Sequence, residues 1–186
     1  MIVLGVDPGT ATTGYGVVRG DGVAPSALIE CGVIRTRPRD TLAARLAEIY
    51  DGIRELIAQH RPDAMAVEDV FYSRNVRTTL VLGHARGVIL LAGEQAGLPI
   101  HEYPPAEIKK AIVGTGAATK EQVQFMVTRL LRLKSAPQPS DASDGVAAAL
   151  ALVMRARYNH RVGTAIAAAG TARPPAIPTA AGRGRA

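Results

Sequence analysis

Four acidic residues stand where predicted secondary-structure elements begin or end: Asp7, Glu68, Asp141 and Asp144. Asp7 and Glu68 each follow a short apolar run, at 2–6 and 64–67, which indicates a buried strand. Each acid therefore lies at the end of a strand, where open α/β sheets hold their ligands. Asp141 and Asp144 open an Ala-rich helix three residues apart, so both side chains lie on one helix face.

Three or four converging carboxylates repel one another unless a divalent cation lies among them, and oxygen ligands favour Mg²⁺ or Mn²⁺. Such ions commonly serve phosphodiester hydrolysis. We therefore interpret the four acids as metal ligands and catalytic residues. Two simpler interpretations remain open. Asp7 before Pro8-Gly9 also suits a turn, and Asp141 with Asp144 also suits helix capping.

Basic residues flank a flexible loop at 114–116. Lys109, Lys110 and Lys120 lie on either side of this loop, so its backbone and the ammonium groups could bind phosphates together. The alternative is that these lysines form an ordinary solvated helix face.

An aromatic pair, Phe71-Tyr72, follows Glu68 and precedes Arg74 and Arg77. Aromatic side chains beside arginines suit stacking on an unpaired base, with the arginines on phosphates. Alternatively, Phe71 packs beneath its own loop.

The elements that position these residues follow from apolar periodicity and turn signals. An antiparallel meander of three strands is followed by alternating helices and strands. The predicted strands are 2–6, 14–19, 27–35, 64–67 and 99–103, and the predicted helices are 41–60, 76–96, 107–112, 120–133 and 141–157. We expect Asp40 to cap the first helix, and Thr119 with Gln122 to form a capping box. This order predicts an α/β fold with a mixed five-stranded sheet flanked by helices.

The chain has 186 residues, enough for one domain, which we place at 1–157. Residues 158–186 lack an apolar period, which predicts a disordered tail rich in Ala, Pro, Gly and Arg. Four arginines in that tail supply +4 of the net charge of +6, so residues 1–157 carry only +2. No run approaches the ~20 apolar residues of a membrane span, and the single Cys31 suits a reducing compartment, so we expect a cytoplasmic protein.

Five motifs in order resemble the RuvC-type crossover junction endodeoxyribonucleases. They are GVDPGTATTGYG at 5–16, VEDVFYSRN at 67–75, LGHARG at 82–87, HEYPPAEIKKAIVGTGAATKEQVQ at 101–124 and SDASDGVAAALAL at 140–152. The resemblance implies a ribonuclease H-like fold and a homodimer that resolves four-way (Holliday) DNA junctions in homologous recombination and DNA repair. It also implies one Mg²⁺ site per subunit, with Mn²⁺ as a substitute, and a branch-migration motor complex as partner.

The same resemblance assigns roles to individual residues. The catalytic acids map onto Asp7, Glu68, Asp141 and Asp144, and some members of the family have His at the position of Asp141. Two functional lysines map onto Lys109 and Lys120, and an aromatic wedge that enters the junction maps onto Phe71.

Two other classes of protein remain open. An actin-like phosphotransferase also begins with a strand, an Asp and a Gly-Thr turn, although this chain has no second domain of that kind. A DNA-binding module without catalysis is disfavoured, because four acids in its groove would repel phosphate unless metal is present.

Overall fold

The computed structural model describes residues 1–20, 26–69 and 76–170, without the side chains of 157 and 159–170. A single five-stranded sheet has the order β3-β2-β1-β4-β5. The strands are β1 (Ile2–Asp7), β2 (Thr12–Arg19), β3 (Ala27–Arg35), β4 (Ala64–Glu68) and β5 (Ile100–Tyr103). The first three strands are antiparallel neighbours, and β4 and β5 run parallel to β1, so the predicted mixed sheet is confirmed.

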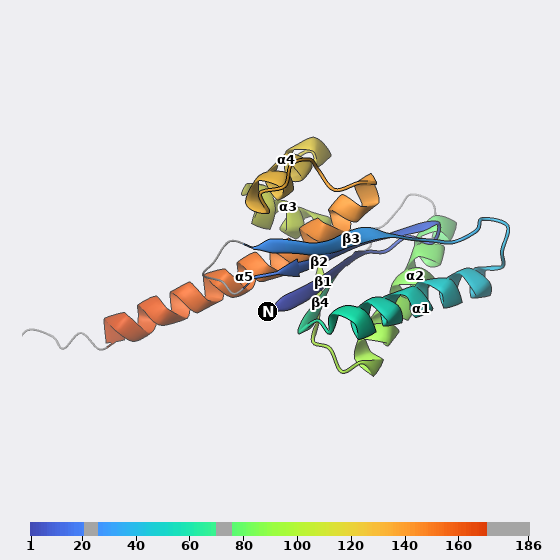
Figure 1. Cartoon of the computed structure of the whole chain (residues 1–186), viewed down its shortest axis with the longest axis horizontal. Helices are drawn as coiled ribbons and strands as arrows, with labels where there is room; N and C mark the ends of the chain where they lie inside the picture. Colours follow the sequence, from blue (N-terminus) through green and yellow to red (C-terminus); the bar gives the residue numbers. More distant parts are fainter. Residues whose placement is uncertain (21–25, 70–75, 171–186) are drawn as a thin grey trace, which may run out of the picture.

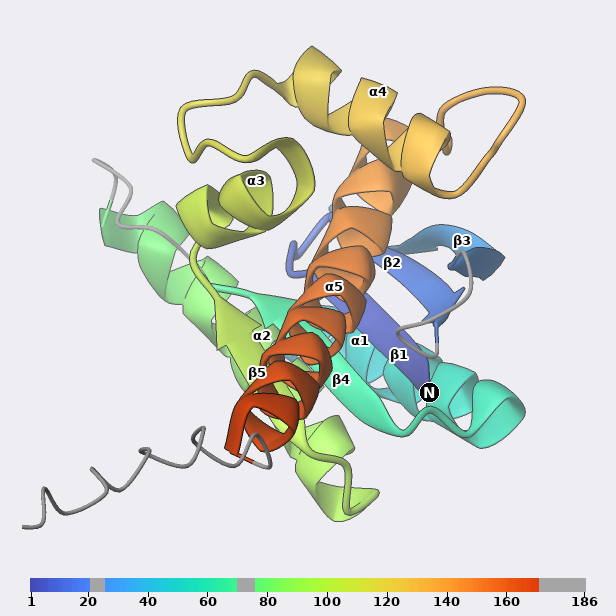
Figure 2. The same cartoon turned by 90° about the vertical axis from the view of Figure 1, so that its left-hand side faces the viewer.

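Helices cover both faces of this sheet (Figures 1 and 2). They are α1 (Leu42–His60), α2 (Val76–Gln95), α3 (Pro105–Val113), α4 (Lys120–Leu130) and α5 (Ser140–Gly170). One core lies between the sheet and α1 with α2, where Leu4, Val6 and Met65 meet Ile53 and Ile89. The other core lies on the opposite face, where the Ala- and Val-rich face of α5 packs on β1 and β2 and is flanked by α3 and α4. Because successive side chains of each strand point to opposite faces of the sheet, one set packs against α1 and α2 and the other set packs against α5.

Glycines allow α5 to lie directly on the sheet. A Cβ on Gly5 of β1 would lie 2.2 Å from the carbonyl oxygen of Gly145, and one on Gly14 of β2 would lie 1.9 Å from that of Asp141. Only glycine permits backbones to approach this closely. The close contact at Gly14 fixes the start of α5 beside the ends of the two strands.

Some predicted boundaries were wrong. α5 ends at Gly170 rather than at 157: the helix continues without an apolar period through 158–164 and then through 165–169, where Ala gives high helix propensity. The helix α1 is capped by Thr41, whose hydroxyl accepts a hydrogen bond from the Ala44 N–H at 3.3 Å, and not by Asp40. The capping box of Thr119 and Gln122 is confirmed. The disorder predicted for the tail lies, from residue 171 onward, outside the described residues.

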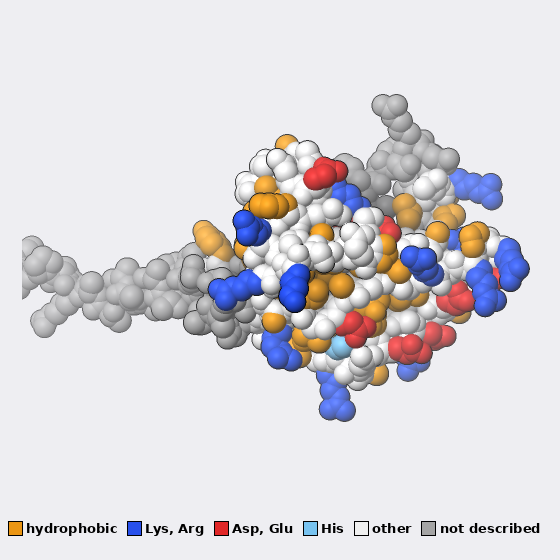
Figure 3. All heavy atoms as spheres, turned by 45° about the horizontal axis from the view of Figure 1, so that its top comes forward, with side chains coloured by type: hydrophobic (Ala, Val, Ile, Leu, Met, Phe, Trp, Pro, Cys, Tyr) orange, Lys and Arg blue, Asp and Glu red, His pale blue; other side chains and the backbone are white. Residues whose placement is uncertain are grey.

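Charged side chains are distributed rather than concentrated. On the face shown in Figure 3, Lys and Arg side chains are spread over several parts of the surface and alternate with acidic ones. This distribution agrees with the small net charge expected for residues 1–157. No helix in the described part of the chain has the length and apolar character needed to span a membrane.

Candidate active site

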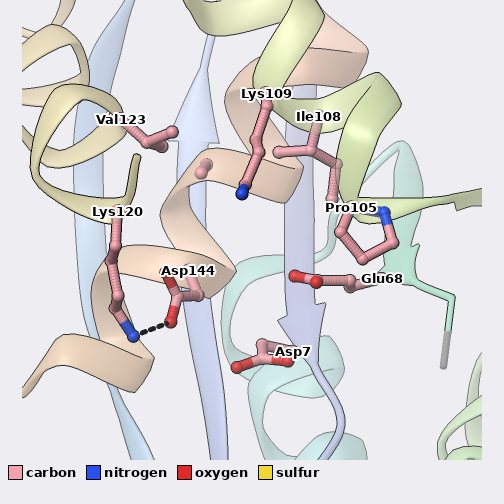
Figure 4. Close-up of a pocket in the computed structure, with 9 residues that line it drawn as sticks. Asp7, Glu68, Pro105, Ile108, Lys109, Lys120, Val123 and Asp144 are labelled. Atoms are coloured by element: carbon pink, nitrogen blue, oxygen red, sulfur yellow. Dashed lines mark hydrogen bonds and ion pairs between the residues drawn. The ribbon is translucent and has the colours of Figure 1, made fainter. Parts of the chain in front are cut away.

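The parallel pairing of β1 with β4 brings the first two acids together. Val6 is in register with Val67, and Asp7 and Glu68 are the next residues of their strands. The neighbours Val3 and Ala66, which share their side of the sheet, belong to the core beneath α5. Asp7 and Glu68 therefore point toward α5, and Figure 4 shows their carboxylates side by side.

The first turn of α5 brings the other two acids to the same place. Oxygen atoms of Asp7, Asp141 and Asp144 lie within 4.8 Å of one another. Asp7, Glu68 and Asp144 also line one cavity of about 260 Å³, together with Lys109, Lys120 and the apolar side chains Pro105, Ile108, Val123 and Ala147. The structure thus brings together all four acids that the sequence singled out.

Burial and mutual repulsion make this cluster costly as it stands. Burial, followed by the charges of Glu68, Asp144 and Asp141, raises the pKa of Asp7 to about 8. Burial and the charge of Asp144 raise the pKa of Glu68 to about 7, although Lys120 and Lys109 oppose this rise. Burial also raises the pKa of Asp144 above its ordinary value, against the hydrogen bond from Lys120. The donor set contains only oxygen, so the cluster fits a hard divalent cation, which would offset this uncompensated charge.

Lys120 and Lys109 approach the acids from two different helices. The capping box fixes the start of α4, and from there Lys120 Nζ donates a hydrogen bond to Asp144 Oδ2 at 2.7 Å (Figure 4). Lys109 projects into the cavity from α3, whose apolar residues Ile108 and Ile112 are buried. Two cations therefore border the acidic cluster, as a site that binds phosphate would need.

The other predicted DNA-binding residues lie apart from the cluster. Lys110 lines a separate hollow between α3 and α5, together with Arg155 and the exposed Tyr158. Arg77 lies at the start of α2 in another hollow, beside Thr10. Phe71, Tyr72 and Arg74 are outside the described residues, so their roles stay predictions.

The sequence analysis gave no role to one well-defined cluster beside the site. Arg86 of α2 forms ion pairs with Asp69, at 3.1 Å, and with Glu102 of β5. Asp69 directly follows Glu68. Each of the three residues falls inside a motif quoted above, but no sequence signal joined them, since the two partners come from parts of the chain distant from α2.

Comparison with known proteins gives consistent relatives. The model of the crossover junction endodeoxyribonuclease RuvC family matches residues 3–152. The RuvC of Pelotomaculum thermopropionicum is 49% identical over 150 residues, covering 81% of this chain and 91% of that protein. The RuvC of Halorhodospira halophila is 53% identical over 148 residues, covering 80% and 87%.

Solved structures agree with this. The structure of Thermus thermophilus RuvC in complex with a Holliday junction substrate has a TM-score of 0.81 and 37% identity, covering 86% of this chain and 96% of that one. The yeast mitochondrial Holliday junction resolvase Ydc2, at 12% identity and a TM-score of 0.63 over 89% and 85%, shares the fold. The predicted ribonuclease H-like architecture is confirmed. With a family match over most of its length and such relatives, the chain belongs to the RuvC family of crossover junction endodeoxyribonucleases.

Proposed function

We propose that this chain resolves four-way DNA junctions by hydrolysing phosphodiester bonds at the site formed by Asp7, Glu68, Asp141 and Asp144. The observation that carries the proposal is the convergence of these acids with Lys109 and Lys120 around one cavity. Acids alone would repel DNA, so the site requires both a metal and nearby cations. Membership of a family of junction endonucleases supplies the substrate class.

The four carboxylates would hold Mg²⁺, or Mn²⁺ in its place, with Asp7 as the central ligand. When bound, the metal supplies an activated water and offsets the charge that develops on the phosphate. Among the described residues that line the cavity there is no Ser, Thr, Tyr or Cys. With the carboxylates engaged as metal ligands, water would be the nucleophile and cleavage would be direct hydrolysis.

Lys120 and Lys109 place positive charge where a phosphate would enter. The Lys120 ammonium partly neutralises Asp144 and keeps the remaining N–H groups for a phosphate oxygen. Lys110, Arg77, Arg74, Phe71 and Tyr72 complete the proposed DNA contacts.

We also propose a homodimer that pairs α2 with its copy. Val76, Leu80 and Leu91 on α2 are exposed by 58%, 60% and 48%. Gly83 and Gly87 fall on the same helix face, and a Cβ on either would meet nothing within 4 Å. Such a face, with small residues at its centre, suits close packing against a second helix. A two-fold dimer would present two equal sites to the two-fold symmetry of a junction.

The test of the activity is cleavage of a synthetic four-way junction beside linear duplex of the same sequence, with Mg²⁺ and with chelator. We expect symmetric nicks in the junction only, and none with chelator. Asp7→Asn should bind the junction and lose at least ~10³-fold in cleavage rate, while Asp51→Asn, an exposed acid on α1, should cut normally. Cleavage by Asp7→Asn at the wild-type rate would contradict the assignment of the site.

The test of the dimer is molar mass in solution. Leu80→Glu places a charge at the centre of the exposed face of α2 and should convert the dimer to a monomer, as measured by light scattering. A wild-type monomer at assay concentration would contradict the dimer. A cytoplasmic location and a branch-migration motor complex as partner also stay predictions.

A further inference from the structure

The end of β4 carries two adjacent carboxylates that contact opposite layers of the protein. Glu68 lines the acidic cavity beneath α5. Asp69, the next residue, contacts Arg86 of α2 at 3.1 Å, and α2 covers the other face of the sheet. The Asp69 N–H also donates a hydrogen bond to the Tyr103 carbonyl oxygen of β5 at 2.8 Å. The residue after Glu68 is therefore held by both its backbone and its side chain.

The Glu68 carboxylate itself has no comparable support. Within the described part of the chain, no group donates a hydrogen bond to it; Lys120 and Lys109 attract its charge, whereas Asp144 repels it. Its position beside Asp7 therefore also depends on the backbone of the strand end. Any contact that fixes this backbone also fixes the carboxylate.

Arg86 is well suited to fix the strand end. Its side chain is only 26% exposed, and the guanidinium contacts Asp69 after β4 and Glu102 within β5. One cation therefore ties α2 to two neighbouring strands. Without it, Asp69 would lose the side-chain contact that joins it to α2, and two carboxylates, 44% and 43% exposed, would share no cation.

We propose that Arg86 is a positioning residue for the metal site: through Asp69 it holds the end of β4, and so keeps the Glu68 carboxylate beside Asp7. The proposal rests on the function proposed above, because it takes Glu68 as a metal ligand. In this proposal α2, whose outer face we assign to the dimer interface, also contacts the end of β4 and thereby stabilises the active site.

The experiment compares Arg86→Gln and Arg86→Lys with the wild-type protein. Three quantities are measured: junction affinity in chelator, kcat with Mg²⁺, and the rise in melting temperature as Mg²⁺ is added. We expect Arg86→Gln to lower kcat by about 10–100-fold and to raise the Mg²⁺ concentration at half of the thermal shift by about tenfold, with junction affinity nearly unchanged. Lys keeps the charge but not the forked geometry, so Arg86→Lys should lie between the two.

Two sets of controls separate positioning from general effects. Arg54→Gln removes the same charge from the exposed surface of α1, where the guanidinium lies 5.7 Å from the centre of the Tyr50 ring, and should leave all three quantities unchanged. Asp69→Asn removes only the contact beside Glu68 and should reproduce the Mg²⁺ effect of Arg86→Gln. Glu102→Gln removes the other contact and should have the smaller effect. If Arg86→Gln fails to fold, Asp69→Asn and Glu102→Gln still test whether the contact with Asp69 positions Glu68.

The proposal is overturned if Arg86→Gln and Asp69→Asn keep the wild-type kcat and Mg²⁺ midpoint. It is also overturned if the loss of kcat is accompanied by an equal loss of junction affinity and by a lower melting temperature in chelator. A purely structural role would produce that pattern. Glu68→Gln serves as the reference. Normal cleavage by Glu68→Gln would refute the proposed site itself, whereas an inactive Glu68→Gln beside normal Arg86 and Asp69 variants would refute only the positioning role.

Discussion

Replacing the central acid should stabilise the metal-free protein while it abolishes cleavage. The pKa of Asp7 rises from 3.8 to about 8 in the folded chain, so the folded state binds this proton more tightly than the unfolded state does. The resulting stability is fully present below about pH 4 and is lost as the pH rises through 8. Asn carries no charge at any pH, and it therefore avoids this loss. A rise of this size corresponds to at most about 6 kcal/mol above pH 8.

The measured gain should be smaller than this limit. The pKa values of Glu68 and Asp144 are also raised, so these residues share the titration with Asp7, and a proton is bound by one or another of the three carboxylates. The cavity also admits water. We expect Asp7→Asn to raise the free energy of unfolding by about 2–3 kcal/mol at pH 8.5, which is roughly 4–12 °C in melting temperature for a chain of this size. At pH 5, which is already above the ordinary pKa of 3.8, the gain should be smaller, roughly a third to a half of that at pH 8.5.

The assay is urea unfolding in chelator at pH 5 and pH 8.5, with Asp51→Asn as the matched control for loss of an exposed acid. Addition of Mg²⁺ at pH 8.5 should stabilise the wild-type protein more than Asp7→Asn, and so narrow or reverse the difference between them. The reasoning is refuted if the two proteins differ by less than about 0.5 kcal/mol at pH 8.5 in chelator. It is equally refuted if the difference is as large at pH 5 as at pH 8.5.

Two further predictions follow from the same geometry. Mg²⁺ must displace the proton of Asp7, so the apparent affinity for Mg²⁺ should rise by up to about tenfold per pH unit between pH 6 and 8. Calorimetric titration in two buffers of different ionisation enthalpy should show that protons are released on binding. An affinity for Mg²⁺ that does not change with pH would contradict this. Gly14→Ala forces a Cβ against the backbone of Asp141, so it should cost about 1–3 kcal/mol of stability and weaken Mg²⁺ binding as well. Unchanged Mg²⁺ binding in a destabilised Gly14→Ala would show that the two backbones separate without moving the acids.

The acids could be found from sequence because their signals are local. Asp7 and Glu68 each end a short apolar run, and Asp141 with Asp144 opens an Ala-rich helix, so each position follows from a few neighbouring residues. Their convergence also depends on the parallel register of β1 with β4. The similar ends of the two strands suggested this pairing, but only the three-dimensional structure shows it.

Adjacent lysines show where this reasoning stops. Lys109 and Lys110 are chemically equal and follow each other on α3, so composition and spacing give them the same prediction. Burial of Ile108 and Ile112 sets the rotation of the helix, and this rotation points Lys109 into the acidic cavity and Lys110 into the hollow beside Arg155. A rotation of about 100° per residue thus separates two lysines that composition and spacing treat alike, and that only the family resemblance distinguished.

The cluster around Arg86 was missed for a deeper reason. Its three members come from α2, β5 and the residue after β4, and no local pattern shows that they contact one another, although each falls within a quoted motif. The four acids repel one another, and Lys120 and Lys109 offset only part of this repulsion from the cavity side. The support that we propose for Arg86 comes instead from α2, on the other face of the sheet. Supporting contacts of this kind are therefore recognisable only once the sheet and both layers of helices are in place.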